Sequence, residues 1–219
     1  MNKILKKRFV SKNKKDNSDE YECDDKEYCS NGTTIEKLIQ KVTFPVTEFV
    51  INLDSDIVSP EYYREVYDIL RKAQEYDTIR FVINTYGGQV DSFIEMYHLM
   101  LNCPALTIAE IHQAYSVGSM ITLCCDNVEF FELSSIMIHP VSYGAIGQAN
   151  EIESKTKFCG EQNKKIFNRI YEGFLTKPEI ERVLNGGDFW LDSKEMERRF
   201  KNWTPIKNRV AGKKEVKKK

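Results

Sequence analysis

The chain alternates short apolar runs with longer stretches in which apolar residues recur every three or four positions. The short runs are rich in β-branched and aromatic residues, as buried strands are, and they occupy residues 49–53, 78–84, 105–111, 128–131 and 135–139. The longer stretches have the spacing of amphipathic helices, and they begin near residue 60, at residue 90, after Ser116 and near residue 150. Strands that alternate with helices predict a layered α/β fold with a mainly parallel sheet.

Two of the expected helices carry further signals. Ser59 and Pro60 begin the first one, with the serine as the cap and the proline in the first turn. The last one is expected to run from about residue 150 to 174 as a long amphipathic helix. Its apolar stripe consists of Ile152, Cys159, Ile166, Phe167, Ile170 and Phe174.

Both ends of the chain depart from this pattern because charge dominates them. Residues 1–35 hold a basic block followed by an acidic block, and residues 206–219 end in "AGKKEVKKK". Such sequences bury too little apolar surface to order themselves. We therefore expect a flexible charged segment over residues 1–35, a folded domain over 36–205 and a flexible basic tail over 206–219. The tail is a solubilising segment in the simplest interpretation.

Composition narrows the classes of function. With 219 residues, of which 41% are hydrophobic, the chain can bury one core of good size. A net charge of -1 gives no bias toward nucleic acid or an anionic membrane, and no apolar run reaches the roughly 18 residues that span a bilayer. The six cysteines match neither a zinc pattern nor a disulfide framework, which predicts a reducing compartment and hence the cytoplasm.

Candidate chemistry gathers around Ser116, in the sequence "EIHQAYSVGSMI". This serine follows a predicted strand and opens an apolar helix, whose N-terminus favours developing negative charge. Gly118 lets the turn approach a ligand closely. Upstream, "NTYGGQV" places Gly87 and Gly88 after another strand, at the sheet edge where ligands collect. Each signal is weak alone, since such a serine is usually a helix cap and such a glycine pair is usually a turn.

Two further residues could complete a catalytic set with the serine. His139 closes the apolar run "SIMIH", and a histidine near neutral pH can take a serine proton and return it to a leaving amine. Capping of the strand end is the alternative. Asp188, in "NGGDFWLDS", is expected to be partly buried and to orient the imidazole, while Asp192 has the position of a helix cap. The order Ser, His, Asp differs from those of α/β-hydrolases, chymotrypsin and subtilisin.

Four separated blocks resemble the signature blocks of the proteolytic subunit of Clp protease and come in the same order: "INTYGGQVDSF", "IHQAYSVGSMI", "MIHPVSYGAIGQANEIE" and "GGDFWLDSKEM". The similarity covers roughly residues 45–200. It implies a crotonase-like spiral of βαβ units with a protruding handle helix and hairpin. Two residues depart from the family pattern: Tyr115, where a small residue is usual, and Pro140, where glutamine is common.

The resemblance also implies roles for individual residues. Ser116 is the nucleophile, His139 the base and Asp188 the orienting acid, and the backbone N–H groups of Gly88 and Val117 form the oxyanion hole. The implied substrate-binding residues are Gly87, Gln89, Val90, Val141 and Tyr143. No metal or cofactor is implied in the subunit itself, because ATP would be used by a partner ATPase.

The implied function is that of an ATP-dependent serine endopeptidase, which cleaves unfolded proteins inside two stacked heptameric rings. A Clp-type ATPase would unfold and feed the substrate, with no nucleic acid or membrane involved. Three alternatives remain open at this point. They are a specialised protease without an ATPase, for example in viral particle maturation; an inactive or regulatory ring subunit; and an acyl-CoA-binding enzyme of the wider crotonase group. The Ser, His and Asp argue against the last.

Overall fold

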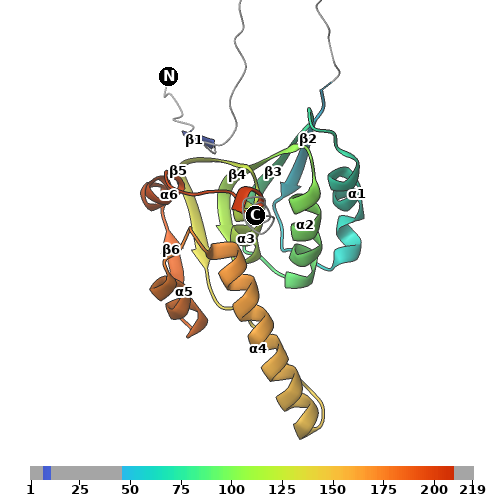
Figure 1. Ribbon diagram of the computed structural model, residues 1–219, viewed down its shortest axis with the longest axis vertical. Coiled ribbons are helices and arrows are strands. Elements are labelled where there is room, and N and C mark those ends of the chain that lie inside the picture. Colours follow the sequence, from blue (N-terminus) through green and yellow to red (C-terminus); the bar gives the residue numbers. More distant parts are fainter. Residues whose placement is uncertain (1–6, 11–45, 210–219) are drawn as a thin grey trace, which may run out of the picture.

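The computed structural model of the chain describes residues 7–10 and 46–209, which form a six-stranded sheet with helices packed around it (Figure 1). The strands are β1 (Lys7–Val10), β2 (Glu48–Leu53), β3 (Thr78–Thr85), β4 (Leu106–Tyr115), β5 (Asn127–Ile138) and β6 (Phe189–Leu191). The helices are η2 (Pro60–Tyr63), α1 (Arg64–Lys72), α2 (Val90–Asn102), α3 (Val117–Cys124), α4 (Ala149–Tyr171), α5 (Lys177–Leu184) and α6 (Ser193–Phe200).

The sheet is mainly parallel, as the sequence predicts. Strands β2, β3, β4 and β5 are parallel neighbours, and each step from one to the next passes through a helix. Strand β1 pairs antiparallel with the start of β5, and β6 pairs antiparallel with its end. Strand β1 lies inside the segment expected to be flexible, so that expectation is wrong for Lys7–Val10, and the rest of the segment up to residue 35 lies outside the described residues.

The core lies between the sheet and its helices. Alternate residues of β3, namely Ile79, Phe81 and Ile83, are completely buried, as the two-residue period of a strand requires when one face packs against helices. Every residue of α3 is buried as well. Ser116 directly precedes α3, so the candidate nucleophile is attached to a helix that is buried on all sides.

The charged side chain of Arg80 fixes the register of the four parallel strands β2 to β5. Arg80 on β3 donates hydrogen bonds to Glu48 on β2 at 2.8 Å, Glu110 on β4 at 3.1 Å and Glu129 on β5 at 2.7 Å. Glu129 is nearly fully buried, and a buried carboxylate is tolerated only with such partners. A one-residue slip of any of these strands would therefore separate charges as well as core residues.

The two strands expected over residues 128–131 and 135–139 are one continuous strand, β5. The residues between them form an irregularity, at which the register with β4 jumps after Ile111. Ser134 compensates for the lost ladder bonds, because its hydroxyl accepts from the N–H of Phe131 at 2.8 Å and donates to the carbonyl of Ile111 at 2.6 Å. His139 is the first residue beyond the strand.

Helix α4 protrudes from the body of the molecule, and the chain segment that leads into it runs alongside the far end of the helix (Figure 1). Its start is defined by Gln148, whose N–H donates to the Glu151 carboxylate at 3.0 Å. The expected hairpin in front of the helix is wrong, since residues 139–148 form no strand in the described structure. Pro140 lacks a donor and two glycines loosen the segment, so no ladder forms within it.

Helices α5 and α6 are joined by an arginine between two glutamates. Arg199 donates to Glu179 at 2.7 Å and to Glu195 at 2.7 Å. Its hydrogen bond lowers the pKa of Glu179 to about 2. The pKa of Glu195 is also lowered to about 2, first by a hydrogen bond from Arg198 and then by one from Arg199.

The folded body extends beyond residue 205, where the basic tail was expected to begin. Ile206 is almost completely buried, and Lys207 Nζ lies 3.3 Å from the Asp126 carboxylate. Arg209 donates to the carbonyl of Ile170 at 3.1 Å. The expectation of a flexible tail is therefore wrong for residues 206–209, and residues 210–219 lie outside the described part. Within residues 7–10 and 46–209, none of the helices has the length and apolarity to cross a membrane.

Candidate active site

Ser116 occupies the N-cap position of α3, but its side chain does not cap the helix. Its backbone has φ 53° and ψ −118°, and within residues 7–10 and 46–209 it is the one non-glycine residue with positive φ. The N–H of Ser116 donates to the carbonyl of Met137 at 2.8 Å, which holds the turn against β5. Strain of this kind persists at functional turns that present a side chain to a ligand. The helix-cap interpretation of Ser116 is therefore wrong.

The Gly87-Gly88 turn lies directly against Ser116. Gly87 has φ +103°, and a Cβ on it would stand 2.6 Å from the Cβ of Ser116. Gly88 has φ +146°, and a Cβ there would lie 2.1 Å from the carbonyl oxygen of Ile57. Ile57 fastens the turn, since its N–H donates to Gly87 at 2.7 Å and its carbonyl accepts from Gln89 at 2.7 Å. The N–H of Gly88 takes no part in these two bonds.

His139 and Asp188 stand at the ends of strands next to the serine. The last pair of the antiparallel β5–β6 ladder is Ile138 with Phe189, so the next position brings His139 opposite Asp188. The parallel β4–β5 ladder ends with Tyr115 beside Met137, so Ser116 follows at the same edge. Three separate segments of the chain thus bring a serine, a histidine and an aspartate to one edge of the sheet.

A groove of about 990 Å³ runs past this edge. Ser116 and His139 line it, together with all five residues that the resemblance implies for substrate binding and with Gly88: Gly87, Gln89, Val90, Val141 and Tyr143. Val117 is fully buried, and Asp188 lies outside the lining. Asp188 is exposed rather than partly buried, because the Gly-Gly turn before it carries it to the surface. In the described part of the chain, the three side chains form no hydrogen bond with one another.

One wall of the groove escaped the sequence interpretation. It consists of six residues of α4, namely Lys155, Phe158, Cys159, Gln162, Asn163 and Ile166. Their spacing of three and four residues places them on one helix face, and this spacing is visible in the sequence. The predicted apolar stripe includes only two of the six, Cys159 and Ile166. Asp56, Ile57 and Val58 also line the groove, from a loop after β2 that carries no recognisable motif.

A buried polar chain links the nucleophile turn to the end of α4. The hydroxyl of Ser119 donates to the carbonyl of Ser116 at 2.6 Å, and it lies 2.7 Å from the hydroxyl of Tyr171. Tyr171 is completely buried, and this burial raises the pKa of its phenol. The protruding helix and the strained serine are therefore joined through two side-chain hydroxyls, which carry no recognisable motif in the sequence.

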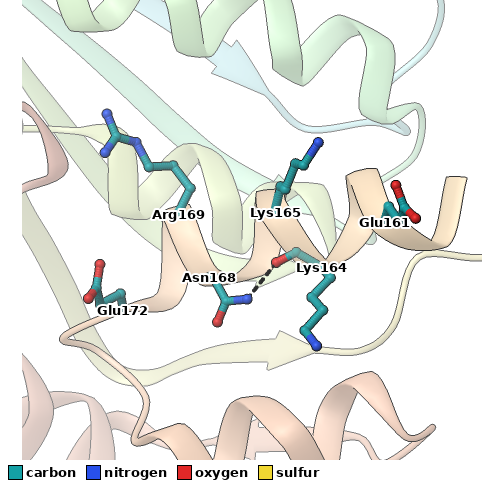
Figure 2. Close-up of a pocket in the computed structure, with 6 residues that line it drawn as sticks. All are labelled: Glu161, Lys164, Lys165, Asn168, Arg169 and Glu172. Carbon is teal, nitrogen blue, oxygen red and sulfur yellow. Dashed lines mark hydrogen bonds between the residues drawn. The ribbon is translucent and has the colours of Figure 1, made fainter. Parts of the chain in front are cut away.

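A second groove, of about 570 Å³, lies on a different face of α4 (Figure 2). It is lined by Glu161, Lys164, Lys165, Asn168, Arg169 and Glu172. Asn168 donates to the carbonyl of its own helix at Lys164, at 2.8 Å, and Arg169 donates to the Tyr97 hydroxyl at 2.8 Å. Its acidic and basic side chains all come from the surface of one helix, and no described serine, cysteine or histidine lines it, so it contains no candidate nucleophile with a base.

Two sequence expectations for single residues are settled by local contacts. Asp192 caps α6, as expected, because its carboxylate accepts from the N–H of Glu195 at 2.9 Å. Ser59 lies at the N-cap of η2 with Pro60 in the first turn, but its side chain makes no capping hydrogen bond. Within the described ranges, no three His, Cys, Asp or Glu side chains are grouped in a way that could hold a metal ion.

Comparison with protein families agrees with this geometry. The family model of the Clp protease matches residues 36–198, which is well over half of the chain. The match spans the Gly-Gly turn, the Ser116 turn, His139 and Asp188, as well as the helix that protrudes from the body. The chain belongs to the Clp protease family, whose members are serine peptidases.

Proposed function

We propose that this chain is a serine endopeptidase subunit in which Ser116, His139 and Asp188 act together. The observation that carries the proposal is the uncapped, positive-φ Ser116 at the same sheet edge as His139 and Asp188. A helix-capping serine has no reason to adopt such a backbone, whereas a nucleophile on a sharp strand-to-helix turn does.

The reaction follows from the chemistry of these groups. Ser116 Oγ attacks the carbonyl carbon of the scissile peptide bond while His139 accepts the hydroxyl proton. When the tetrahedral intermediate collapses, the C–N bond breaks and His139 returns the proton to the leaving amine. Water, activated by the same histidine, then releases the acyl group from Ser116. Asp188 orients the imidazole and stabilises its protonated form.

The oxyanion would be held by two backbone donors, the N–H groups of Gly88 and Val117. Gly88 N–H is left out of the bonds that fasten its turn, and Val117 is the first residue of α3, where N–H groups have no partner within the helix. The helix N-terminus adds a favourable field for the negative charge. Preorganised donors of this kind account for about 10²–10³ in kcat each.

The substrate would be an extended peptide lying in the groove between the Gly-Gly turn and α4. Gly87, Gln89 and Val90 present an open chain edge to which a peptide backbone can bind as an added strand. Val141 and Tyr143, from the segment after the histidine, contribute apolar surface on the other side. A chain without stable structure fits this mode, because a folded protein does not offer an extended strand.

The working form would be a ring assembly, in which two heptameric rings stack through the segment after His139 and α4. Ile146 is fully exposed and Ile152 partly so, and such apolar surface on a projecting element is a liability unless a partner covers it. A second copy of the chain is the expected partner in this family. A Clp-type ATPase would deliver unfolded substrate and use the ATP, since the subunit chemistry needs none.

One observation favours a second candidate, a ring subunit with reduced activity or none. Asp188 is exposed, and no hydrogen bond joins the three side chains within residues 46–209 of the single chain. In the first proposal, assembly brings them into contact, because the segment that follows His139 is part of the contact between rings. In the second, they stay apart in the assembly as well.

Cleavage of casein and of a fluorogenic peptide, with and without a Clp-class ATPase, tests both candidates. The protease proposal expects peptide cleavage by the assembled protein alone and casein cleavage that requires the ATPase. Ser116→Ala should lower kcat by about 10⁴–10⁶. Casein cleavage without any ATPase would favour the specialised protease, and an assembled protein that cleaves neither would favour the inactive subunit.

A further inference from the structure

Tyr115, the residue before the proposed nucleophile, belongs to a row of side chains that crosses four segments of the sheet. Tyr115 on β4 pairs with Met137 on β5, and Met137 pairs with Trp190 on β6. On its other side, the β3–β4 ladder ends with Thr85 beside Ala114. The next position along this ladder brings Tyr86 beside Tyr115.

Ring contacts hold this row together. Tyr115 meets Tyr86 with a centroid distance of 5.7 Å and an angle of 62°, and it meets Trp190 at 5.4 Å and 75°. Both contacts have the edge-to-face geometry that aromatic pairs prefer. The hydroxyl of Tyr115 lies 2.9 Å from that of Ser135 on β5. Tyr115 therefore contacts side chains on all three neighbouring segments.

The row lies directly behind the proposed catalytic groups. Each of its members stands within two residues of one such group, and the pairs are Tyr86 with Gly88, Tyr115 with Ser116, Met137 with His139 and Trp190 with Asp188. A shift of the end of β3 or of β6 relative to the end of β4 would have to break one of the two ring contacts of the row. The spacing of the catalytic groups is thereby tied to the spacing of the rings.

Tyr115 and Trp190 do not line the substrate groove, although the rings of the row are partly exposed. Tyr86 and Trp190 are 73% and 61% exposed, and Tyr115 is half-buried between them. Tyr86 belongs to the groove lining, whereas Tyr115 and Trp190 lie beside it. An effect of Tyr115 on catalysis must therefore act through the strands that it contacts.

We propose that Tyr115 is a positioning residue, which fixes the spacing of the strand ends that carry Gly88, Ser116 and Asp188 through its ring contacts with Tyr86 and Trp190. The inference rests on the proposed protease function. A small residue at this position would leave the two exposed rings without a partner between them. Because a misplacement of about 1 Å can cost up to about 10²-fold in rate, the loss should appear in kcat.

Steady-state peptide cleavage by four variants tests this role. Tyr115→Ala should lower kcat about tenfold or more, with KM within about twofold of the wild type. Tyr115→Phe keeps both ring contacts and should keep kcat. Trp190→Ala removes one contact and should show an intermediate loss. Tyr62→Ala, which truncates an exposed ring on η2, is the matched control and should change neither constant.

Three results would overturn the proposal: an unchanged kcat in Tyr115→Ala, a change confined to KM, or an equal loss in Tyr115→Phe, which would assign the effect to the hydroxyl. If Tyr115→Ala does not fold, the exposed Trp190→Ala decides alone.

Amide hydrogen exchange over residues 86–88 and 116–118 adds a readout that does not need activity. It should quicken in Tyr115→Ala and Trp190→Ala, and unchanged exchange refutes the positioning role. A wild type without Ser116-dependent cleavage refutes the protease function instead.

Discussion

His139 stands opposite Asp188 at the first position beyond the β5–β6 ladder, whose last pair is Ile138 with Phe189. The two residues come from segments almost fifty positions apart in the chain, and the ladder brings them to one edge of the sheet. Ser116 follows the neighbouring strand β4 at the same edge. The relationship among these residues is thus a property of strand register, and changes that alter the register or the turns at this edge should affect activity first.

The Gly-Gly turn is the first place to test this. In Gly88→Ala, the new Cβ would stand 2.1 Å from the carbonyl oxygen of Ile57 at a φ of +146°, so backbone must move. We expect kcat/KM to fall about 10²-fold or more and the protein to be destabilised by about 1–3 kcal/mol. Gly173→Ala is the control, since this glycine also has a positive φ, +84°, but nothing in the described chain lies within 4 Å of its Cβ position and it does not line the groove, so kcat/KM should stay unchanged. Wild-type turnover in Gly88→Ala would remove this turn from the oxyanion hole.

The buried hydroxyl pair behind the nucleophile gives a second prediction. Ser119→Ala deprives both the Ser116 carbonyl and the Tyr171 hydroxyl of a partner. We expect it to lower the free energy of unfolding by about 1–3 kcal/mol. Tyr171→Phe leaves the bond to Ser116 intact and should cost less.

Urea unfolding of the two single variants and of the double variant measures this coupling. Because removal of both partners leaves no orphaned hydroxyl, the double variant should be more stable than the sum of the single effects predicts. Strict additivity would show that the Ser119–Tyr171 contact has no energetic weight.

A third prediction concerns pH. The pKa values of Glu179 and Glu195 are lowered to about 2 in the folded chain, from the ordinary 4.5. Both carboxylates bind protons more readily in the unfolded chain, so their contribution to stability is complete above pH 4.5 and is lost as the pH falls toward 2.

Arg199→Gln should therefore flatten the loss of stability between pH 5 and pH 3, besides destabilising the protein by about 1–2 kcal/mol at pH 7. Thermal melting across this range measures both effects. Arg64→Gln, at an exposed position on α1, should retain the wild-type slope. An Arg199 variant with the full wild-type slope would assign the acid sensitivity to other carboxylates.

Assembly gives a fourth prediction. Replacement of Ile146 and Ile152 by aspartate puts charges on the surface that we assign to the contact between rings, at a cost of several kcal/mol for each buried site. We expect the wild type to sediment as a large ring assembly and the double variant as smaller, nearly inactive species. Tyr76→Asp, at an exposed ring on a loop before β3, serves as the control. A wild type that sediments as a fully active monomer would contradict the assembly and favour a specialised protease.

Local patterns in the sequence predicted most of the fold. The period-two and period-3.6 runs located β2, β3, α2 and α4 to within a few residues, because β2, β3, α2 and the last turns of α4 pack against a common core. The pattern failed where side chains replace backbone bonds. Ser134 keeps β5 continuous where the sequence predicted two separate strands, and no local signal marks this.

The candidate site was predictable only in part, for a similar reason. Ser116, the glycine pair and His139 each follow a strand, and strand ends are visible in the sequence. The exposure of Asp188 depends on a turn at the surface, and the α4 wall depends on how far that helix extends past the sheet edge. The row through Tyr115 exists only once four segments are in register, so the sequence marked this tyrosine as unusual without a reason for it.

Active-site labelling shows whether Ser116 is a nucleophile activated by His139. The assembled protein is treated with a serine-reactive fluorophosphonate, and the modified residue is identified by mass spectrometry of its peptides. We expect one adduct, on Ser116, that forms at least about 10²-fold more slowly in His139→Ala and is absent in Ser116→Ala. Labelling that is spread over other serines, or that is equally fast without His139, would contradict the assignment of Ser116 as the nucleophile and His139 as its base.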